Sequence, residues 1–261
     1  MDSPRPTTIR VVRQYWYRHA PPVPHLPFHA RSYTGTMTRA LFFVSEDGYW
    51  GEECVEPLTT LKDAGVDVDV ATPAGNPPVV DDRSVDPDEV GEDTAEHVLD
   101  VHENDPDLND PEPFAAVDAS EHDAVVFPGG HGTVWDVNQD RHARAALRTA
   151  VAGDDGVALV VCHAVGILAF TRSEPGDLIV DGRDVTGFPN AWEEGIVDDH
   201  DRLEGRKLPY WVEDEVVAAG GNWDAELDAD TSVTVDGDLV TARGPGSSAA
   251  AADALLDELG Y

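Results

Sequence analysis

Lysine, cysteine and long apolar runs are all scarce in this chain of 261 residues. The only lysines are Lys62 and Lys207, and the only cysteines are Cys54 and Cys162. One disulfide could not staple a chain of this size, so we expect a reduced, cytoplasmic location. No stretch approaches the roughly 18 apolar residues of a membrane span, and no apolar segment follows the N-terminal arginines as in a secretory signal. The sequence therefore favours a cytoplasmic protein with no membrane partner.

Acidic residues outnumber basic ones by 52 to 17, which gives a formal net charge of −35. So large a charge of one sign repels itself and opposes compaction in ordinary salt. At molar ionic strength the Debye length falls to about 3 Å and screens that repulsion. We therefore expect a protein from a halophile, the alternative being an acidic protein from a mesophile. Nucleic acid is not an expected partner, because phosphate binding needs clustered Lys and Arg.

The charge changes sign near Met37. Residues 1–36 carry five arginines and one acid, whereas residues 37–261 carry 12 basic and 51 acidic groups. The first segment is also rich in proline and has no helical or strand period. We expect 1–36 to be a non-native or disordered basic extension with Met37 as the true start, or else a functional basic tail. Residues 37–261 are then a single domain.

From residue 39 the chain alternates short apolar runs with helical stretches, which is typical of an α/β fold with a mainly parallel sheet. A strongly acidic, proline-punctuated stretch at 81–123 interrupts this alternation, and we expect a helical insertion over the sheet. Predicted strands lie at 40–44, 66–71, 123–128 and 157–161, predicted helices at 52–64, 141–152, 163–170 and 247–259, and a hairpin at 232–235 and 239–242.

Cys162 stands where an apolar strand ends and a helix is predicted to begin. A nucleophile at such a turn projects above the sheet, and nearby helix N–H groups favour a thiolate with a lowered pKa. The alternative is a buried structural cysteine, which is common. Position alone does not decide between them.

Several collinear motifs carry a family resemblance. They are VVCHA at 160–164, FPGGHGTVWD at 127–136, GYWGEECVEP at 48–57, TGFPNAWEE at 186–194, LPYWVED at 208–214, VDGDLVT at 235–241 and GPGSS at 244–248. In these motifs the chain resembles the PfpI-like superfamily, and more narrowly its glyoxalase III and heat-shock chaperone branch, from about residue 39 to the C-terminus. That resemblance implies a three-layer, flavodoxin-like sandwich with the class I glutamine amidotransferase-like fold.

The resemblance implies a role for each matching residue. Cys162 is similar to the nucleophile, and Glu53, four residues before Pro57, to the carboxylic acid that hydrogen-bonds its sulfur. Burial of that carboxyl in an apolar pocket would raise its pKa and fit it for acid–base work. Glu52 is the alternative to Glu53 for this position of the motif, and we expect Cys54 to pack in the core.

His163 is similar to the family's catalytic histidine and Glu193 to the acid that orients it, with Glu194 as the alternative. The backbone N–H groups of Gly130 and His163 resemble an oxyanion hole. The chain departs from many relatives at Ala164, where glycine is usual, and we expect its methyl group to narrow the pocket.

Three other sites are weighed and not predicted. His97, His102 and His122 lie in or beside the acidic insertion, but His97 and His102 are five residues apart, which is poor spacing for one helix face. The glycine-rich 244–248 lacks the lysine of a phosphate loop. Class I glutamine amidotransferases need a His-x-Glu after the cysteine, and neither His163 nor His200 begins one. We predict no metal and no cofactor.

The function implied by the resemblance is glutathione-independent conversion of methylglyoxal to lactate by Cys162. Deglycase activity on glycated groups is chemically similar and is not separated from it. The rival interpretation is a non-enzymatic stress protein, either a holding chaperone or a cysteine redox sensor, and a cysteine peptidase is less favoured. The expected partners are a small dicarbonyl substrate and a second copy in a homodimer.

Overall fold

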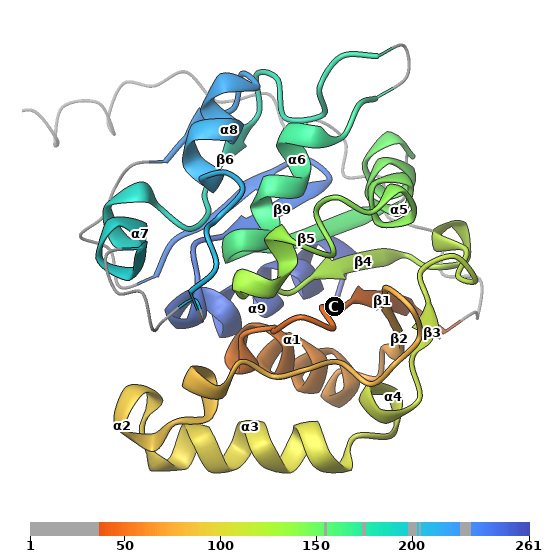
Figure 1. Ribbon diagram of the computed structural model, residues 1–261. Coiled ribbons are helices and arrows are strands. Elements are labelled where there is room, and N and C mark those ends of the chain that lie inside the picture. The colour runs from red at the N-terminus through yellow and green to blue at the C-terminus, as the bar shows by residue number, and fades with distance from the viewer. Residues whose placement is uncertain (1–36, 154–155, 174–175, 198–202, 204, 225–230) are drawn as a thin grey trace, which may run out of the picture. The chain divides into compact units, whose positions relative to one another are not determined.

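A seven-stranded sheet forms the centre of the molecule (Figure 1). The computed structural model describes residues 37–261 apart from 154–155, 174–175, 198–202, 204 and 225–230, so the predicted extension 1–36 lies outside the described residues. All neighbouring strands are parallel except β8, which is antiparallel to β9. In spatial order the strands are β3 (Glu112–Pro113), β2 (Asp67–Thr72), β1 (Arg39–Phe43), β4 (Ala124–Phe127), β5 (Val157–Val161), β9 (Leu239–Ala242) and β8 (Val233–Asp236).

Helices cover both faces of this sheet, which confirms the predicted three-layer α/β sandwich (Figure 1). On one face lie α1 (Gly51–Asp63) and α9 (Ser248–Leu259). On the other lie α5 (Arg141–Ala152) and α6 (Gly166–Phe170), with α8 (Val212–Ala218) packed against α6. A separate two-stranded sheet pairs β6 (Asp184–Val185) with β7 (Asn222–Trp223).

The central strands read as unbroken apolar runs because both of their faces are buried. In β1, Leu41 and Phe43 pack into the apolar cluster with α5 and α6, whereas Phe42 packs into the cluster with α1 and α9. All three side chains are fully buried. This alternation, which follows from the two-residue period of a strand, divides the core into two layers.

The acidic stretch at 81–123 is largely helical, as predicted, and one short helix of it, α4 (Pro106–Asn109), packs against β2, but its main helix does not lie on the sheet. Its main helix, α3 (Glu92–Asn104), packs against the outer side of α1 (Figure 1), because α1 already covers that face. Lys62 of α1 binds Asp105 and Asp107, with both nitrogen–oxygen distances at 2.6 Å. The remaining pieces are a 3-10 turn at Asp82–Val85, α2 (Pro87–Val90), α4 (Pro106–Asn109), the edge strand β3 and a 3-10 turn at Ala119–Glu121.

The C-terminal hairpin has its predicted turn, with Gly237 at φ +63° between β8 and β9. Ser247, the first residue of the predicted helix 247–259, directly precedes α9, and its side chain makes no capping hydrogen bond to the helix. Its hydroxyl accepts instead from the backbone N–H of Ser232, at 3.0 Å, and so ties the start of the hairpin to the start of the helix.

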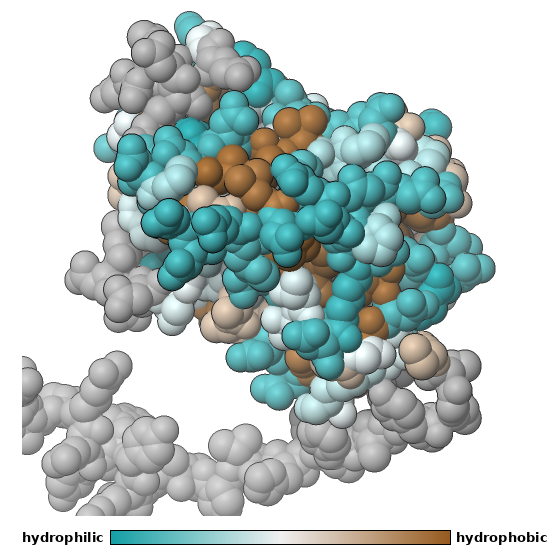
Figure 2. Space-filling view, turned by 90° about the horizontal axis from the view of Figure 1, so that it is seen from below, coloured by the Kyte–Doolittle hydropathy of each residue, from teal (hydrophilic) through white to brown (hydrophobic). Residues whose placement is uncertain are grey.

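Hydrophilic residues cover most of the face seen from below, with smaller apolar patches between them (Figure 2). Among the described helices, none has the length and apolar character needed to cross a bilayer. Among the described residues, Glu53 and Glu193 are the only acidic side chains that are buried, so the acidic excess is carried largely by positions that solvent reaches, where mobile ions can screen it.

We predict that the melting temperature of this protein rises steeply with KCl concentration. Raising KCl from about 0.1 M to about 1 M shortens the Debye length from about 10 Å to about 3 Å, so repulsion among the surface carboxylates falls. Differential scanning calorimetry across this series measures the effect, and a parallel series in sucrose at constant salt serves as the control. A melting temperature that does not change with KCl would contradict the screening argument.

Candidate active site

Segments that leave the carboxyl ends of four parallel strands converge on one small volume, where ligands bind in open α/β sheets. Cys162 follows β5, Gly129 follows β4, Glu53 lies on the helix after β1, and Gly244 follows β9. A methyl group built on Gly129 would lie 2.4 Å from Glu53 Oε2 and 2.6 Å from Cys162 Cβ. Glycine at this position therefore allows the carboxyl and the cysteine to approach each other.

Cys162 occupies a strained backbone conformation. Its φ of +57° makes it the one non-glycine residue with positive φ in the described part of the chain. The predicted helix over 163–170 is divided into a 3-10 turn, Cys162–Val165, followed by α6. This sharp turn directs the cysteine side chain above the sheet edge, and such strain is typical of nucleophiles placed between a strand and a helix.

The expected lowering of the Cys162 pKa was wrong. Burial and the neighbouring carboxyl of Glu53 raise the pKa of this thiol well above its usual value, outweighing the N–H groups of Gly130 and His163 that lower it. The side chain is 3% exposed, so little water solvates a thiolate there. The resting thiol is therefore protonated at neutral pH and needs a base during reaction.

Glu53 lies in the same pocket as the thiol. Complete burial raises its pKa to about 8, against smaller effects of the Cys162 thiol and the Gly129 N–H that favour ionisation. Neither carboxylate oxygen has a partner with hydrogen-bond geometry. Pro57 has no N–H to donate to the Glu53 carbonyl, so the first turns of α1 lack one regular bond at this residue. At neutral pH this carboxyl is mostly a neutral acid.

The structure separates the candidates that the sequence left open. Glu52 is only partly buried and accepts a hydrogen bond from the indole Nε1 of Trp50, at 3.1 Å. Glu194 is exposed, whereas Glu193 is buried. Cys54 is fully buried in the core, where its thiol pKa is raised well above the usual range. Of the four candidate acids, Glu53 and Glu193 are buried and the other two are not.

The backbone N–H groups of Gly130 and His163 both face the Cys162 sulfur and favour negative charge on it. Gly130 has φ +104°, and its carbonyl accepts from the hydroxyl of Thr133 at 2.8 Å. A Cβ on Gly130 would meet the backbone nitrogen of Trp50 at 2.5 Å. The close backbone contacts of Gly130 thus hold its N–H group beside that of His163 at the sulfur.

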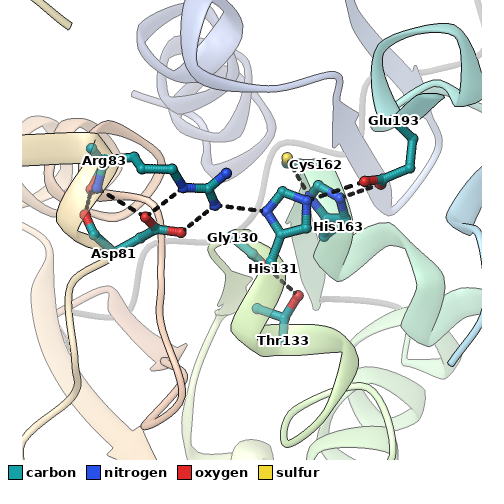
Figure 3. Close-up of polar contacts among 9 residues, drawn as sticks. Asp81, Arg83, Gly130, His131, Thr133, Cys162, His163 and Glu193 are labelled. Atoms are coloured by element: carbon teal, nitrogen blue, oxygen red, sulfur yellow. Dashed lines mark hydrogen bonds and ion pairs between the residues drawn. The ribbon is translucent and has the colours of Figure 1, made fainter. Parts of the chain in front are cut away.

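His163 lies between the thiol and Glu193 (Figure 3). Its Nδ1 is 3.2 Å from Cys162 Sγ, and its Nε2 is 2.7 Å from Glu193 Oε2. Glu193 comes from α7 (Asn190–Val197), and the ring of Phe188 stacks on the His163 ring at 4.3 Å between centroids. Hydrogen bonds from His163 and His131 lower the pKa of Glu193 to about 2, despite its burial.

Ala164 does not narrow the pocket, contrary to expectation. Its side chain is fully buried in the apolar cluster beneath α5 and α6, on the side of the turn away from the thiol. The residue after the Cys-His pair therefore affects core packing rather than substrate space.

The sequence reasoning missed two residues of this site. His131, within the GGHG motif, lies with its ring 4.0 Å from that of His163 and its Nε2 3.2 Å from Glu193 Oε1. Arg83, from the acidic insertion, donates to His131 Nδ1 at 3.0 Å (Figure 3). The motif could have indicated His131, but nothing in the local pattern of the insertion distinguishes Arg83.

A cavity of about 90 Å³ opens beside the thiol. Its lining is mainly apolar and aromatic, with a few polar groups directed at one point, which is typical of a small-molecule site. The lining residues are Trp50, Glu53, Arg83, Glu89, Gly130, His131, Cys162, His163, Phe188, Ile196 and Pro245.

The chain also matches the model of a known protein family over most of its length. The model of the DJ-1/PfpI family matches residues 38–258. The chain belongs to the DJ-1/PfpI family.

Curated members of the DJ-1/PfpI family are similar over part of their length. A probable glutathione-independent glyoxalase of Schizosaccharomyces pombe is 30% identical over 148 residues, covering 55% of this chain and 64% of that protein. A protein/nucleic acid deglycase of Pseudomonas aeruginosa is 30% identical over 152 residues, covering 55% of this chain and 50% of that protein. The matches thus span less than two thirds of these relatives.

Solved DJ-1/PfpI structures show the same fold. Glyoxalase III from Candida albicans superposes with a TM-score of 0.72 at 21% identity, covering 85% of this chain and 97% of that one. DJ-1beta from Drosophila melanogaster superposes with a TM-score of 0.56 at 21% identity, covering 86% and 91%. At such identities the likeness concerns the fold alone.

The three histidines weighed as metal ligands do not gather. His97 is exposed, His102 bonds the hydroxyl of Tyr49 at 2.8 Å, and His122 bonds Asp69 at 2.8 Å. Each of the latter two has a partner from the fold around the sheet, so these histidines have structural roles.

Within the described ranges, one other group of three side chains has the spacing for a metal ion, namely His131, His163 and Glu193, whose nearest ligand atoms lie within 4.8 Å of one another. These atoms already bond one another, and His131 Nδ1 accepts from Arg83. The hydrogen bonds account for the grouping, and we assign no metal to it.

We predict that Gly130→Ala destabilises the protein by about 2–5 kcal/mol, because it adds both backbone strain and a clash with backbone atoms. The matched control is Gly65→Ala, where φ is +85° but nothing lies within 4 Å of the new Cβ. Strain alone should cost about 1–2 kcal/mol there. Urea unfolding in molar KCl measures both, and equal losses would contradict the close approach at Gly130.

We predict that Glu53→Gln stabilises the protein increasingly as pH rises. Between about pH 4.5 and pH 8 the folded protein keeps a proton on Glu53 that the unfolded chain has released, so wild-type stability falls through this window. At about 1.4 kcal/mol per pKa unit, the variant should gain on the order of 5 kcal/mol by pH 8.5.

Unfolding free energies from pH 5 to pH 8.5 check this expectation. Glu56→Gln, on the same helix, is the control and should show the same fall with pH as the wild type, because it retains Glu53 and does not affect its pKa. Parallel pH curves for wild type and Glu53→Gln would mean that Glu53 is not the buried neutral acid described above.

Proposed function

We propose that this protein is a cysteine-dependent, glutathione-independent glyoxalase that converts methylglyoxal to lactate. The observation that carries the proposal is the joint presence, around the Cys162 thiol, of a neutral acid (Glu53), a histidine base (His163) and two converging N–H groups. Isomerisation of an α-ketoaldehyde needs these groups: a nucleophile, a proton carrier and stabilisation of an oxyanion.

In the first step, Nδ1 of His163 takes the thiol proton as the sulfur attacks the aldehyde carbon. The carbon–sulfur bond forms and the carbonyl oxygen becomes negative, facing the N–H groups of Gly130 and His163. Protonation of that oxygen completes a hemithioacetal. Because the resting thiol is protonated, attack and proton removal are coupled.

In the second step, the C1 proton moves to C2 through an enediolate, carried by Glu53 or His163. The product is a thioester of lactate on Cys162, in which C1 is oxidised and C2 is reduced, with no external electron carrier. Water then cleaves the thioester, releases lactate and returns the proton to the thiol. The sum is methylglyoxal plus water giving lactate and one proton.

The size and lining of the pocket support a small substrate. A cavity of about 90 Å³ has room for a few non-hydrogen atoms, and Phe188 and Ile196 can contact a methyl group. A glycated side chain presents the same hemithioacetal chemistry at its aldehyde-derived carbon. The relatives named as deglycases make this a related activity of the proposed enzyme.

The rival interpretations have less support from the site. A redox sensor needs an exposed, low-pKa thiol, whereas Cys162 is 3% exposed and its pKa is raised. The pocket is also too small for a polypeptide segment, which disfavours a peptidase. No described feature specifically favours a holding chaperone.

We expect the wild type to consume methylglyoxal and form lactate in molar KCl, and Cys162→Ser to lose at least 1000-fold in kcat/KM, about 4 kcal/mol of transition-state stabilisation. Cys54→Ala is the matched control, since it removes the other thiol from the core, and it should keep turnover within a few-fold. Absence of lactate formation by the folded wild type would refute the glyoxalase proposal. Equal loss in both cysteine variants would indicate a structural effect.

A further inference from the structure

Five buried or partly buried side chains form one continuous chain of hydrogen bonds that ends at the thiol (Figure 3). Arg83 Nη2 lies 3.0 Å from His131 Nδ1, and His131 Nε2 lies 3.2 Å from Glu193 Oε1. Glu193 Oε2 lies 2.7 Å from His163 Nε2, whose Nδ1 faces Cys162 Sγ at 3.2 Å. The two histidines are 6% and 1% exposed, so water does not compete for these contacts.

The arginine at one end fixes the direction of the first bond. A guanidinium only donates hydrogen bonds and does not lose its proton in proteins. His131 Nδ1 must therefore accept from Arg83, and a neutral imidazole with Nδ1 as acceptor carries its proton on Nε2. That N–H then donates to Glu193. A protonated His131 would place a second N–H against the guanidinium.

The carboxylate of Glu193, in the middle of the chain of hydrogen bonds, fixes the direction of the bonds from both histidines. An ionised carboxylate only accepts, so Glu193 receives an N–H from His131 and an N–H from His163. His163 thus carries its proton on Nε2 and presents an unprotonated Nδ1 to the thiol. We propose that Arg83 is a positioning residue that keeps His131 neutral and thereby leaves the charge of Glu193 to orient His163 as the base for Cys162.

Arg83 is itself held firmly in this place. Asp81 binds it through two contacts, Nε to Oδ1 at 3.0 Å and Nη2 to Oδ2 at 2.6 Å. Its guanidinium lies 5.7 Å from the centre of the Trp50 ring. Glu89 of α2 also lines the cavity. The acidic insertion therefore contributes one oriented cation, Arg83, to the pocket beside the thiol.

The charged groups around His131 support this role. Burial, the imidazole of His163 and the guanidinium of Arg83 lower the pKa of His131, and Glu193 raises it, with a result of about 4. Asp81 lies behind Arg83, and Glu53 faces Cys162 from α1. Without the arginine, His131 loses one cation and gains freedom to protonate Nδ1. It then takes up a proton at higher pH and competes for Glu193.

The first test uses the wild type alone. Histidine labelled with ¹⁵N, in protein dialysed against EDTA, reports by NMR which ring nitrogen carries the proton, and His131→Asn and His163→Asn assign the two signals. We expect both histidines to be Nε2–H tautomers from pH 6 to pH 8. A proton on Nδ1 of either histidine would overturn the proposal.

The second test compares three variants by the same titration. Arg83→Met removes the cation, and the His131 midpoint should move up by at least one pH unit. Arg83→Lys keeps a cation that only donates, and it should stay close to the wild type although it loses the two-point contact with Asp81. Arg206→Met is the matched control, since Arg206 lies over Trp135 and pairs with Asp47 instead of His131. It should leave the titration unchanged.

The role in turnover rests on the proposed function and has its own measurement. At pH 5, Arg83→Met should lower kcat for methylglyoxal at least about twofold with KM unchanged, and the loss should disappear at pH 8, where His131 is neutral in both proteins. Lack of turnover in the wild type would refute the glyoxalase proposal while the titration still tests Arg83. Equal shifts in the Met and Lys variants, or no shift in either, would overturn the positioning role.

Discussion

The buried carboxylate of Glu193 is the group on which the rest of the site depends. Placing an ionised carboxylate at 2% exposure is unfavourable unless hydrogen bonds replace its water. Here two imidazole N–H groups do so, and they come from the ends of two neighbouring strands, β4 and β5. The hydrogen bonds of the charged Glu193 therefore hold α7 against the segments that follow β4 and β5. The same hydrogen bonds orient the imidazole rings of His131 and His163.

On the other side of the Cys162 sulfur, Glu53 is also a buried carboxyl, but its pKa is shifted in the opposite direction. It has no N–H donors with hydrogen-bond geometry to replace water, so burial raises its pKa to about 8, whereas that of Glu193 is about 2. Two carboxyls within one pocket thus stand in different protonation states at neutral pH. Such separation is typical of pockets in which one carboxyl transfers protons and another supplies a fixed negative charge.

Much of this arrangement was predictable from the sequence, and the two exceptions both depend on how distant segments pack together. The strand that delivers Cys162 is an apolar run, and the registers of Glu53 and Glu193 came from motifs that the structure places beside the thiol. Reasoning from the sequence counted the helix N–H groups around the thiol but not its burial, so it gave the wrong direction for that pKa. Arg83 was missed because its approach to His131 depends on how the insertion crosses the sheet edge, which local patterns do not encode.

The chain of hydrogen bonds from Arg83 to Cys162 lies largely below the protein surface. The molecule therefore has two electrostatic environments, one at its surface and one in its interior. Surface carboxylates interact through water that holds mobile ions, so their mutual repulsion depends on ionic strength. His131, His163 and Glu193 are buried below that layer, where screening by mobile ions is weaker. A change in salt therefore affects the repulsion among surface carboxylates more than the proton affinities at the centre of the molecule. The acidic exterior and the protonation of the buried groups around the thiol thus depend on different parts of the chain.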